Sequence, residues 1–96
     1  MKITWDETKR LQNLRDHQLD FRDADRVFAG PTITFEDARF DYDEWRFIPV
    51  GLLAGRVVVL SHTQRGDSIR MISMREGTKR EEIRFFQNLR ASCAGR

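Results

Sequence analysis

Residues 62–81 read HTQRGDSIRMISMREGTKRE and hold a turn, a strand and the start of a helix. The turn centres on Gly66, because glycine adopts a positive φ without steric cost. The stretch 68–75 is predicted to be a strand. Thr78 and Glu81 then form a capping box, the side-chain pattern that begins many helices. A strand between a tight turn and a capped helix predicts a hairpin-built sheet with a helix after it.

The residues before this stretch supply two more strands of the same sheet. The strand over residues 56–63 contains the longest apolar run of the chain, Val57–Leu60. A turn at Leu53–Gly55 joins it to a strand over residues 45–52, and short turns of this kind predict an antiparallel meander. Around the meander we expect short strands over residues 2–5 and 32–35, an acidic loop over 37–43, and helices over 7–17, 21–28 and from Thr78 to about Leu89.

The apolar residues of each helix predict the side that packs inward. In the helix over residues 7–17, which Asp6 caps, Leu11 and Leu14 form a narrow apolar stripe. The C-terminal helix is expected to bury Ile83, Phe86 and Leu89. Helices before and after the meander should cover one face of the sheet, which predicts an α+β fold with two N-terminal helices and one C-terminal helix.

Composition limits the class of protein. A chain of 96 residues with 40% hydrophobic and 33% charged residues predicts one globular domain, residues 1–96, that needs no disulfide or metal to fold. The only cysteine, Cys93, cannot form an internal disulfide, which fits the reducing cytoplasm. The N-terminus lacks the apolar segment of a signal peptide, and no apolar run could span a membrane.

The charge is unevenly distributed along the chain. Residues 1–54 carry 8 Lys/Arg and 11 Asp/Glu, whereas residues 55–96 carry 9 and 4, so net charges of −3 and +5 sum to +2. Such asymmetry indicates charged partners, with a merely solvated surface as the plainer alternative. RNA is the leading candidate for a polyanion that binds the basic half. The cations that could bind its phosphates are Arg46, Arg65, Arg70, Arg75, Lys79 and Arg80.

Strand geometry limits how these cations converge. Side chains alternate across a regular strand, so Arg70 and Arg75 cannot share a face unless a bulge lies between them or Arg75 acts from the strand end. Arg70 could equally pair with an acidic residue across the sheet. Lys79 and Arg80 oppose the dipole of the last helix, and a phosphate bound there would relieve this.

The two histidines are the candidates for proton transfer. Metal-free RNA cleavage needs a base for the 2′-hydroxyl, an acid for the leaving oxygen and cations for the phosphate. His17 and His62 could supply the first two, although a structural or exposed role is the commoner one for isolated histidines. Neither a metal-binding spacing nor a phosphate-binding glycine loop is present in the sequence, so no metal and no cofactor are predicted.

Four short motifs of aromatic, charged and small residues follow one another along the chain. They are Trp5-Asp6-Glu7 with Lys9, Asn13 and His17; Phe21 with Ala24, Val27 and Phe28; Trp45-Arg46 with Val50-Gly51; and Ile69–Ser73 with Arg75, Thr78, Arg80 and Glu81. In this order and spacing they resemble the BrnT toxins of bacterial type II toxin–antitoxin systems over nearly the whole chain. The chain departs from the family pattern at Asp16, Gln18, Glu76-Gly77 and Phe85 or Phe86, where the family usually has Lys, Gly, Lys-Ala and Tyr.

The resemblance implies a RelE-like α+β fold and ribonuclease activity that halts translation. It also implies a BrnA-type antitoxin with a ribbon-helix-helix domain, a hetero-oligomeric complex, and contact with operator DNA through the antitoxin alone. Matched positions make His17, Arg70, Arg75 and Arg80 catalytic candidates, with His62 added from the residue pattern. Lys79, a near match, joins Arg46 and Arg65 as candidates for phosphate binding.

Two functions therefore compete at this point. The first is a metal-independent endoribonuclease toxin that cleaves RNA and inhibits translation. The second is a non-catalytic basic module that binds an antitoxin or nucleic acid through the same surface. RNA cleavage and growth arrest on expression distinguish the two.

Overall fold

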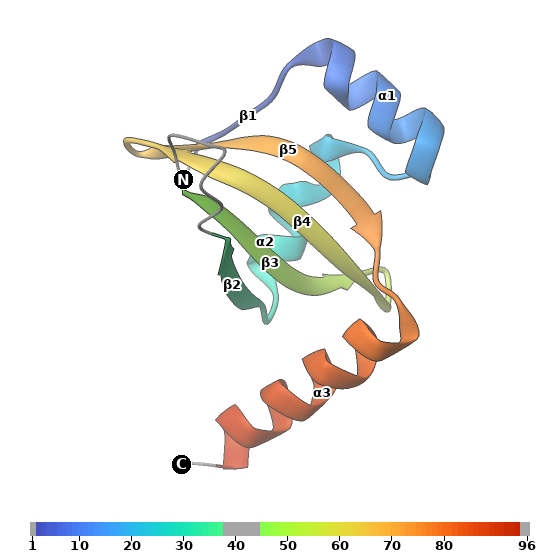
Figure 1. Cartoon of the computed structure of the whole chain (residues 1–96), viewed down its shortest axis with the longest axis vertical. Coiled ribbons are helices and arrows are strands. Elements are labelled where there is room, and N and C mark those ends of the chain that lie inside the picture. The colour runs from blue at the N-terminus through green and yellow to red at the C-terminus, as the bar shows by residue number, and fades with distance from the viewer. Residues whose placement is uncertain (1, 38–44, 95–96) are drawn as a thin grey trace.

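The computed structural model describes residues 2–37 and 45–94, so most of the acidic loop expected over residues 37–43 lies outside it. A five-stranded sheet has the order β1-β5-β4-β3-β2, and helices precede and follow it (Figure 1). The elements in chain order are β1 (Lys2–Thr4), α1 (Glu7–His17), the 3-10 turn η1 (Phe21–Asp23), α2 (Ala24–Ala29), β2 (Ile33–Asp37), β3 (Arg46–Leu53), β4 (Arg56–Arg65), β5 (Ser68–Glu76) and α3 (Lys79–Ala94).

The predicted α+β class and the meander of β3, β4 and β5 are confirmed. Each of these strands pairs antiparallel with the next, and Gly66 has the positive φ of 60° that the β4–β5 turn requires. The two short strands occupy the edges. β2 pairs antiparallel with β3, whereas β1 runs parallel to β5, so the sheet is mixed.

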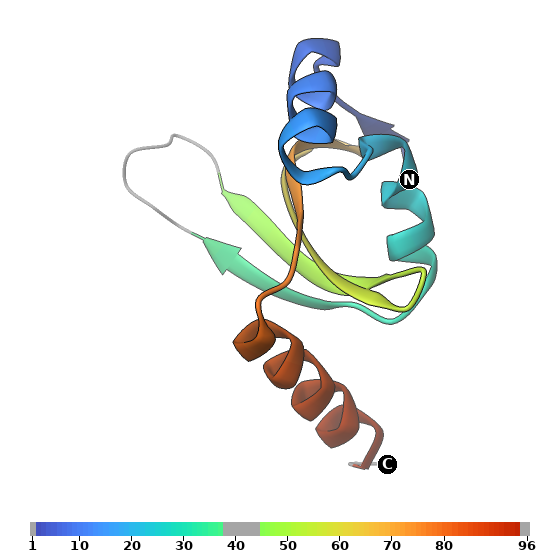
Figure 2. The same cartoon turned by 90° about the vertical axis from the view of Figure 1, so that its right-hand side faces the viewer.

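The prediction that the helices cover one face of the sheet is wrong. Strand alternation divides β4 between two apolar clusters, with Val58 and Leu60 on one side and Val57 and Val59 on the other. η1, α2 and the edge of α1 cover the first side, and α3 covers part of the second (Figure 2). Each face therefore has its own small core.

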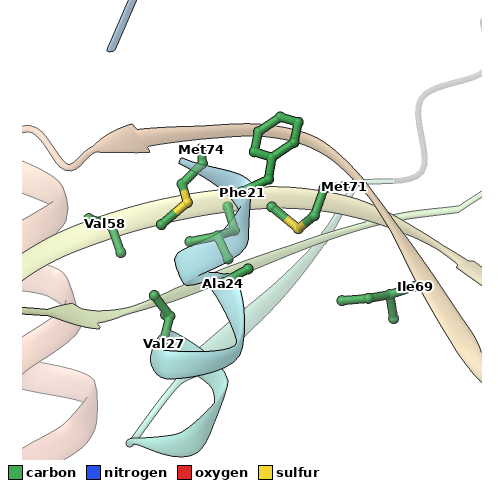
Figure 3. Packing of buried hydrophobic residues seen from close by; sticks show 8 residues of the cluster. Phe21, Ala24, Val27, Val58, Ile69, Met71 and Met74 are labelled. Carbon is green, nitrogen blue, oxygen red and sulfur yellow. The ribbon is translucent and has the colours of Figure 1, made fainter. Parts of the chain in front are cut away.

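The larger core lies under α2. Figure 3 shows its buried side chains, which η1, α2, β4 and β5 contribute: Phe21, Ala24, Val27, Val58, Leu60, Ile69, Met71 and Met74. The close approach of α2 to the sheet depends on Gly51 in β3. A Cβ at this position would lie 2.7 Å from Cγ1 of Val27 and 3.0 Å from Cγ2 of Thr32. Burial of each large side chain in such a core contributes roughly 1.5–3 kcal/mol.

The prediction for the buried side of α1 is also wrong. Leu11 and Leu14 are 52% and 38% exposed, whereas Arg10 and Asn13 are each 7% exposed. Arg10 is satisfied by ion pairs with Glu7 and with Asp20, the latter at 3.0 Å. A polar helix side can be buried here because carboxylates satisfy Arg10 and backbone groups satisfy Asn13.

Asn13 completes the outer edge of β5. β1 pairs with Ser68–Arg70, and no strand among the described residues neighbours the rest of that edge. The side chain of Asn13 accepts a hydrogen bond from the Met74 amide at 3.0 Å and donates to the Met74 carbonyl at 2.8 Å. It also donates to the carbonyl of Leu19 at 2.9 Å. One side chain thus replaces a missing strand and fixes α1 against the sheet.

Replacement of Asn13 by alanine is expected to lower the free energy of unfolding by about 2–3 kcal/mol. The substitution leaves the buried amide and carbonyl of Met74 without partners, and each such group costs about 1–3 kcal/mol. Urea unfolding measures the loss, with Gln12→Ala on the exposed side of α1 as the matched control. An equal loss in both variants would show that Asn13 has no special role.

α3 is held by its first turn and by one buried aromatic residue. The predicted capping box forms: the Thr78 amide donates to Glu81 at 2.9 Å, and the Glu81 amide donates to the Thr78 hydroxyl at 3.2 Å. Phe85 is 2% exposed and packs on Val50, Val57 and Val59. The predicted inward side of α3 was wrong in part, since Leu89 packs against this cluster, whereas Ile83 and Phe86 are 48% and 42% exposed.

The Glu81 carboxylate links α3 to β5. It accepts two hydrogen bonds from the guanidinium of Arg75, at 2.7 and 2.8 Å. These bonds, with a smaller contribution from the Thr78 amide, lower the pKa of Glu81 from 4.5 to about 2. The same carboxylate raises the pKa of Arg75. The charged pair therefore persists at any pH at which the protein is folded and Glu81 is ionised.

Glu81→Gln is expected to lower the free energy of unfolding at pH 7 by on the order of 1–2 kcal/mol, with allowance for solvent screening of a partly exposed pair. A carboxylate with a lowered folded-state pKa stabilises the protein fully above its unfolded-state pKa. That stabilisation is lost as the pH falls from about 4.5 to about 2. The difference between wild type and variant should accordingly shrink over this range.

Urea unfolding at a series of pH values tests this expectation. Glu82→Gln is the control, because Glu82 lies in the same turn and makes no side-chain ion pair within residues 2–37 and 45–94. A Glu81→Gln effect that is independent of pH would show that the lost stability comes from the cap alone.

Candidate functional site

A β-bulge brings Arg70 and Arg75 to the same face of the sheet. Ser61 pairs with Ser73, but His62 pairs with Met71, so Ile72 is an extra residue in β5. Met71 and Met74 both enter the α2 core as a result. The residues on the opposite side of β5, Arg70 and Arg75, then project away from that core. Of the two possibilities that the sequence left open, the bulge is the one that occurs.

Arg70 lies in a row of polar residues that crosses three strands. Its Cα partner on β4 is Thr63, and the partner of Thr63 on β3 is Arg46. Directly paired residues of an antiparallel sheet project from the same face. We call this side the arginine face and define it by Arg46, Ser61, Thr63, Arg70, Ser73 and Arg75.

The centre of this row contains a buried hydroxyl group. Thr63 is 2% exposed, and its Oγ1 has no hydrogen-bond partner in the described part of the chain. Arg70 is exposed and makes no ion pair with any described residue. The alternative role of Arg70, an ion pair with an acidic residue across the sheet, does not occur within residues 2–37 and 45–94.

Arg75 has a different environment, because Glu81 occupies its guanidinium group. Its Nη1 also donates to the carbonyl of Glu76 at 3.3 Å. Lys79 and Arg80 follow as exposed residues in the first turn of α3. This end of the arginine face therefore holds one paired cation and two solvent-facing ones.

Arg65 stands apart from these cations. It ends β4 beside the β4–β5 turn and pairs with Ser68. β5 extends from there to Arg75 over seven residues, a distance of about 23 Å. The basic stretch of residues 62–81 consequently separates into three groups: Arg65 at the turn, Arg70 in mid-sheet, and Arg75 with the start of α3.

The histidines lie on the opposite side of the sheet from the arginine face. His62 is 6% exposed, stacks on Phe47 with ring centres 5.6 Å apart, and meets Phe28 edge-on at 5.8 Å. Burial lowers the pKa of His62, so the ring is neutral at pH 7. His17 is exposed at the end of α1 and borders a shallow pocket with Arg56, Val58 and Glu76. Neither side chain is brought beside Arg70.

Sequence inspection missed the hydroxyl residues of the arginine face and the pairing of Glu81. Alternation along the strand from residue 56 places Val59, Ser61 and Thr63 on one side, and this signal was available. The position of Glu81 over Arg75 was not, because it depends on the path of residues 76–78 between β5 and α3.

The arginine face is suited to binding a phosphodiester. Arginine presents a planar fork of donors to phosphate oxygens, and a threonine hydroxyl can donate beside it. No group of three or more His, Cys, Asp or Glu residues that could hold a metal ion occurs in the described ranges. Within those ranges no helix is both long and apolar enough to cross a membrane.

Comparison with known proteins agrees with this chemistry. No curated protein matches the chain. The family model described as "Ribonuclease toxin, BrnT, of type II toxin-antitoxin system" matches residues 5–81, which covers most of the 96 residues. The match includes β2, β3, β4 and β5 and ends in the first turn of α3, whereas β1 lies before its first residue. The chain therefore belongs to the BrnT family of ribonuclease toxins of type II toxin–antitoxin systems, as the four sequence motifs predicted.

Proposed function

We propose that this protein is a metal-independent endoribonuclease toxin whose RNA substrate binds across the arginine face. The observation that carries the proposal is the bulge at Ile72, which places Arg70 and Arg75 on one side of the sheet. The family supplies the reaction class, a ribonuclease. The arginine face supplies cations where the scissile phosphate gains negative charge.

In this mechanism Arg70 and Arg46 bind the non-bridging oxygens of the scissile phosphate. The RNA 2′-hydroxyl attacks the phosphorus and gives its proton to solvent water, and the P–O5′ bond breaks as the 5′-oxygen takes a proton from solvent. Negative charge on the non-bridging oxygens increases in the transition state. Preorganised donors that meet this charge lower the barrier, each typically by a factor of about 10²–10³. The Thr63 hydroxyl, buried between the two arginines, gains a partner when a phosphate oxygen arrives.

Arg75, Lys79 and Arg80 bind the neighbouring phosphates. Arg75 can reach the RNA only by sharing its guanidinium with Glu81, so its first role is to hold α3 in place. Lys79 and Arg80 lie at a helix N-terminus, where a phosphate also meets the positive end of the dipole. Arg65 extends the basic surface at the far end of β4.

The proposal gives His62 a structural role and leaves His17 as the histidine open to solvent. His62 is enclosed by Phe28 and Phe47, and burial of a neutral ring there favours folding. His17 has an exposed ring, but it projects from the other side of the sheet. Catalysis in this arrangement depends chiefly on charge stabilisation by the arginines.

The family implies an antitoxin partner. We propose that this partner is of the BrnA type, with a ribbon-helix-helix domain that binds operator DNA on behalf of the hetero-oligomer. Cleavage of cellular RNA in the cytoplasm would inhibit translation until the antitoxin neutralises the toxin.

Arg70→Ala is expected to reduce the rate of RNA cleavage by about 10²–10³-fold, because one preorganised donor to the scissile phosphate is lost. The first measurement is cleavage of single-stranded RNA by the purified protein in the presence of EDTA. The second is the growth of bacterial cells after expression of the protein is induced. Arg56→Ala is the matched control, since Arg56 is an exposed arginine of the same sheet that projects from the opposite side.

The outcomes separate the proposal from its alternative. Full activity of a folded Arg70→Ala variant would remove Arg70 from the site. Activity that disappears in EDTA and returns with a divalent metal would refute metal independence. Wild-type protein that binds RNA without cleaving it would favour the non-catalytic binding module.

His62→Phe is expected to retain the wild-type cleavage rate, because phenylalanine preserves the aromatic packing between Phe28 and Phe47 and removes only the titratable nitrogens. The stability of the variant should also vary less with pH below about 6.5, where unfolding of the wild type allows His62 to take up a proton. A folded His62→Phe protein without activity would show that His62 takes part in catalysis.

A further inference from the structure

A small apolar pocket lies between α3 and the sheet on the arginine-face side. Three residues of β3 and β4 form its floor, Phe85 of α3 forms a wall, and an aromatic ring of β2 and an arginine of α3 stand at the rim. These lining residues are Ile48, Val50, Val59, Phe85, Phe35 and Arg84. We propose that this pocket binds one base of the RNA, next to the phosphate-binding arginines, an inference that rests on the proposed ribonuclease function.

The size and lining of the pocket fit one planar ring system. Its volume is about 190 Å³, below the roughly 300–1,000 Å³ of pockets that take drug-sized ligands. The floor is aliphatic and the wall aromatic, so a base that enters exchanges water for apolar contact on its faces. The pocket is open on one side, as a site for a base on a continuous strand must be.

The rim residues already form the kind of stack that single-stranded RNA bases join. Arg84 places its Cζ 5.6 Å from the centre of the Phe35 ring, and Phe35 is 38% exposed. Single-stranded bases are commonly bound by stacking on aromatic rings and on arginine planes. The Phe35 ring can therefore stack on a base. The guanidinium of Arg84 can stack on the base or donate a hydrogen bond to its edge.

The pocket is continuous with the arginine face. Glu81 lines the pocket and binds the guanidinium of Arg75, so this cation is one side chain away from a bound base. Along β4, Val59 in the pocket floor is followed by Ser61 and then by Thr63 in the Arg70 row, at about 13 Å. An RNA strand with one base bound in the pocket can thus pass Arg75 and continue toward Arg70.

Other features of α3 favour a base over a side chain of the antitoxin in this pocket. The larger exposed apolar residues of the helix, Ile83 and Phe86, lie in the same turns as Arg84 and Phe85 but do not line the pocket. A protein partner that packs on α3 would bury those residues first. Arg84 and Phe85 also lie beyond the stretch that the family model matches.

Binding of a short 2′-O-methyl RNA oligonucleotide tests the proposal, because the probe lacks the attacking hydroxyl and stays intact. Its affinity is measured by fluorescence anisotropy for the full-length protein. Phe35→Ala is expected to weaken binding by about tenfold, the typical effect of removing a stacking ring. Leu11→Ala, which truncates an exposed apolar residue of α1 that does not line the pocket, should bind like the wild type.

A set of the same oligonucleotides, each with one abasic position, identifies the base. In the wild type, one abasic position should lower the affinity to the level of Phe35→Ala, and in Phe35→Ala the same position should have no further effect. Arg84→Ala should weaken binding more than Arg90→Ala, which removes an exposed cation of α3 that does not line the pocket. Phe35→Tyr keeps the ring and should bind normally.

Failure of this inference differs from failure of the proposed function. Weak binding by Arg70→Ala with normal binding by Phe35→Ala would support the arginine face and refute the base pocket. Normal RNA binding by Phe35→Ala with loss of antitoxin binding would identify the pocket as a protein-docking site instead. Wild-type protein that binds no oligonucleotide would overturn both assignments.

Discussion

The extra residue in β5 is the constraint on which the arrangement of this protein depends. Without Ile72 as a bulge, strand alternation would send Arg70 and Arg75 to opposite faces of the sheet, and it would also send Met71 and Met74 to opposite faces. The bulge satisfies both requirements, since it keeps two methionines in the α2 core and directs two arginines to the other side. A bulge interrupts the ladder locally, and the remaining pairing of β5 with β4 and the contact with Asn13 stabilise the strand around it.

Several residues of the family motifs serve the fold rather than the chemistry. Asp6 caps α1 by accepting from the Thr8 amide at 2.8 Å. Asn13 completes the edge of β5, and Gly51 admits α2 to the sheet. Thr78 and Glu81 cap α3, and Glu81 also fixes Arg75. These positions therefore serve the fold of this chain, and the arginines of β3 and β5 remain the positions suited to phosphate.

The position of α3 connects structure to function. The helix is attached through Glu81 and Phe85, and it covers only one end of the arginine face. Gly77, where the family usually has alanine, donates its amide to the Val57 carbonyl at 2.9 Å, and a Cβ there would lie 3.1 Å from Cγ1 of Val57. A side chain here would require Val57 to shift by a few tenths of an ångström, so glycine suits the close passage of the chain along β4 before α3 begins.

The sequence alone determined the α+β class, the meander of three strands, the capped starts of the helices and the family, because these follow from local patterns that neighbouring residues specify. It did not determine which faces the helices cover, why Arg10 and Asn13 rather than Leu11 and Leu14 face inward, or which cations converge. The tertiary structure decided these points. Asn13 faces inward because the edge of β5 beside it offers unpaired backbone groups. A single inserted residue in β5 brings Arg70 and Arg75 to the same face. Both depend on the register between segments that are distant in the chain, which no local pattern records.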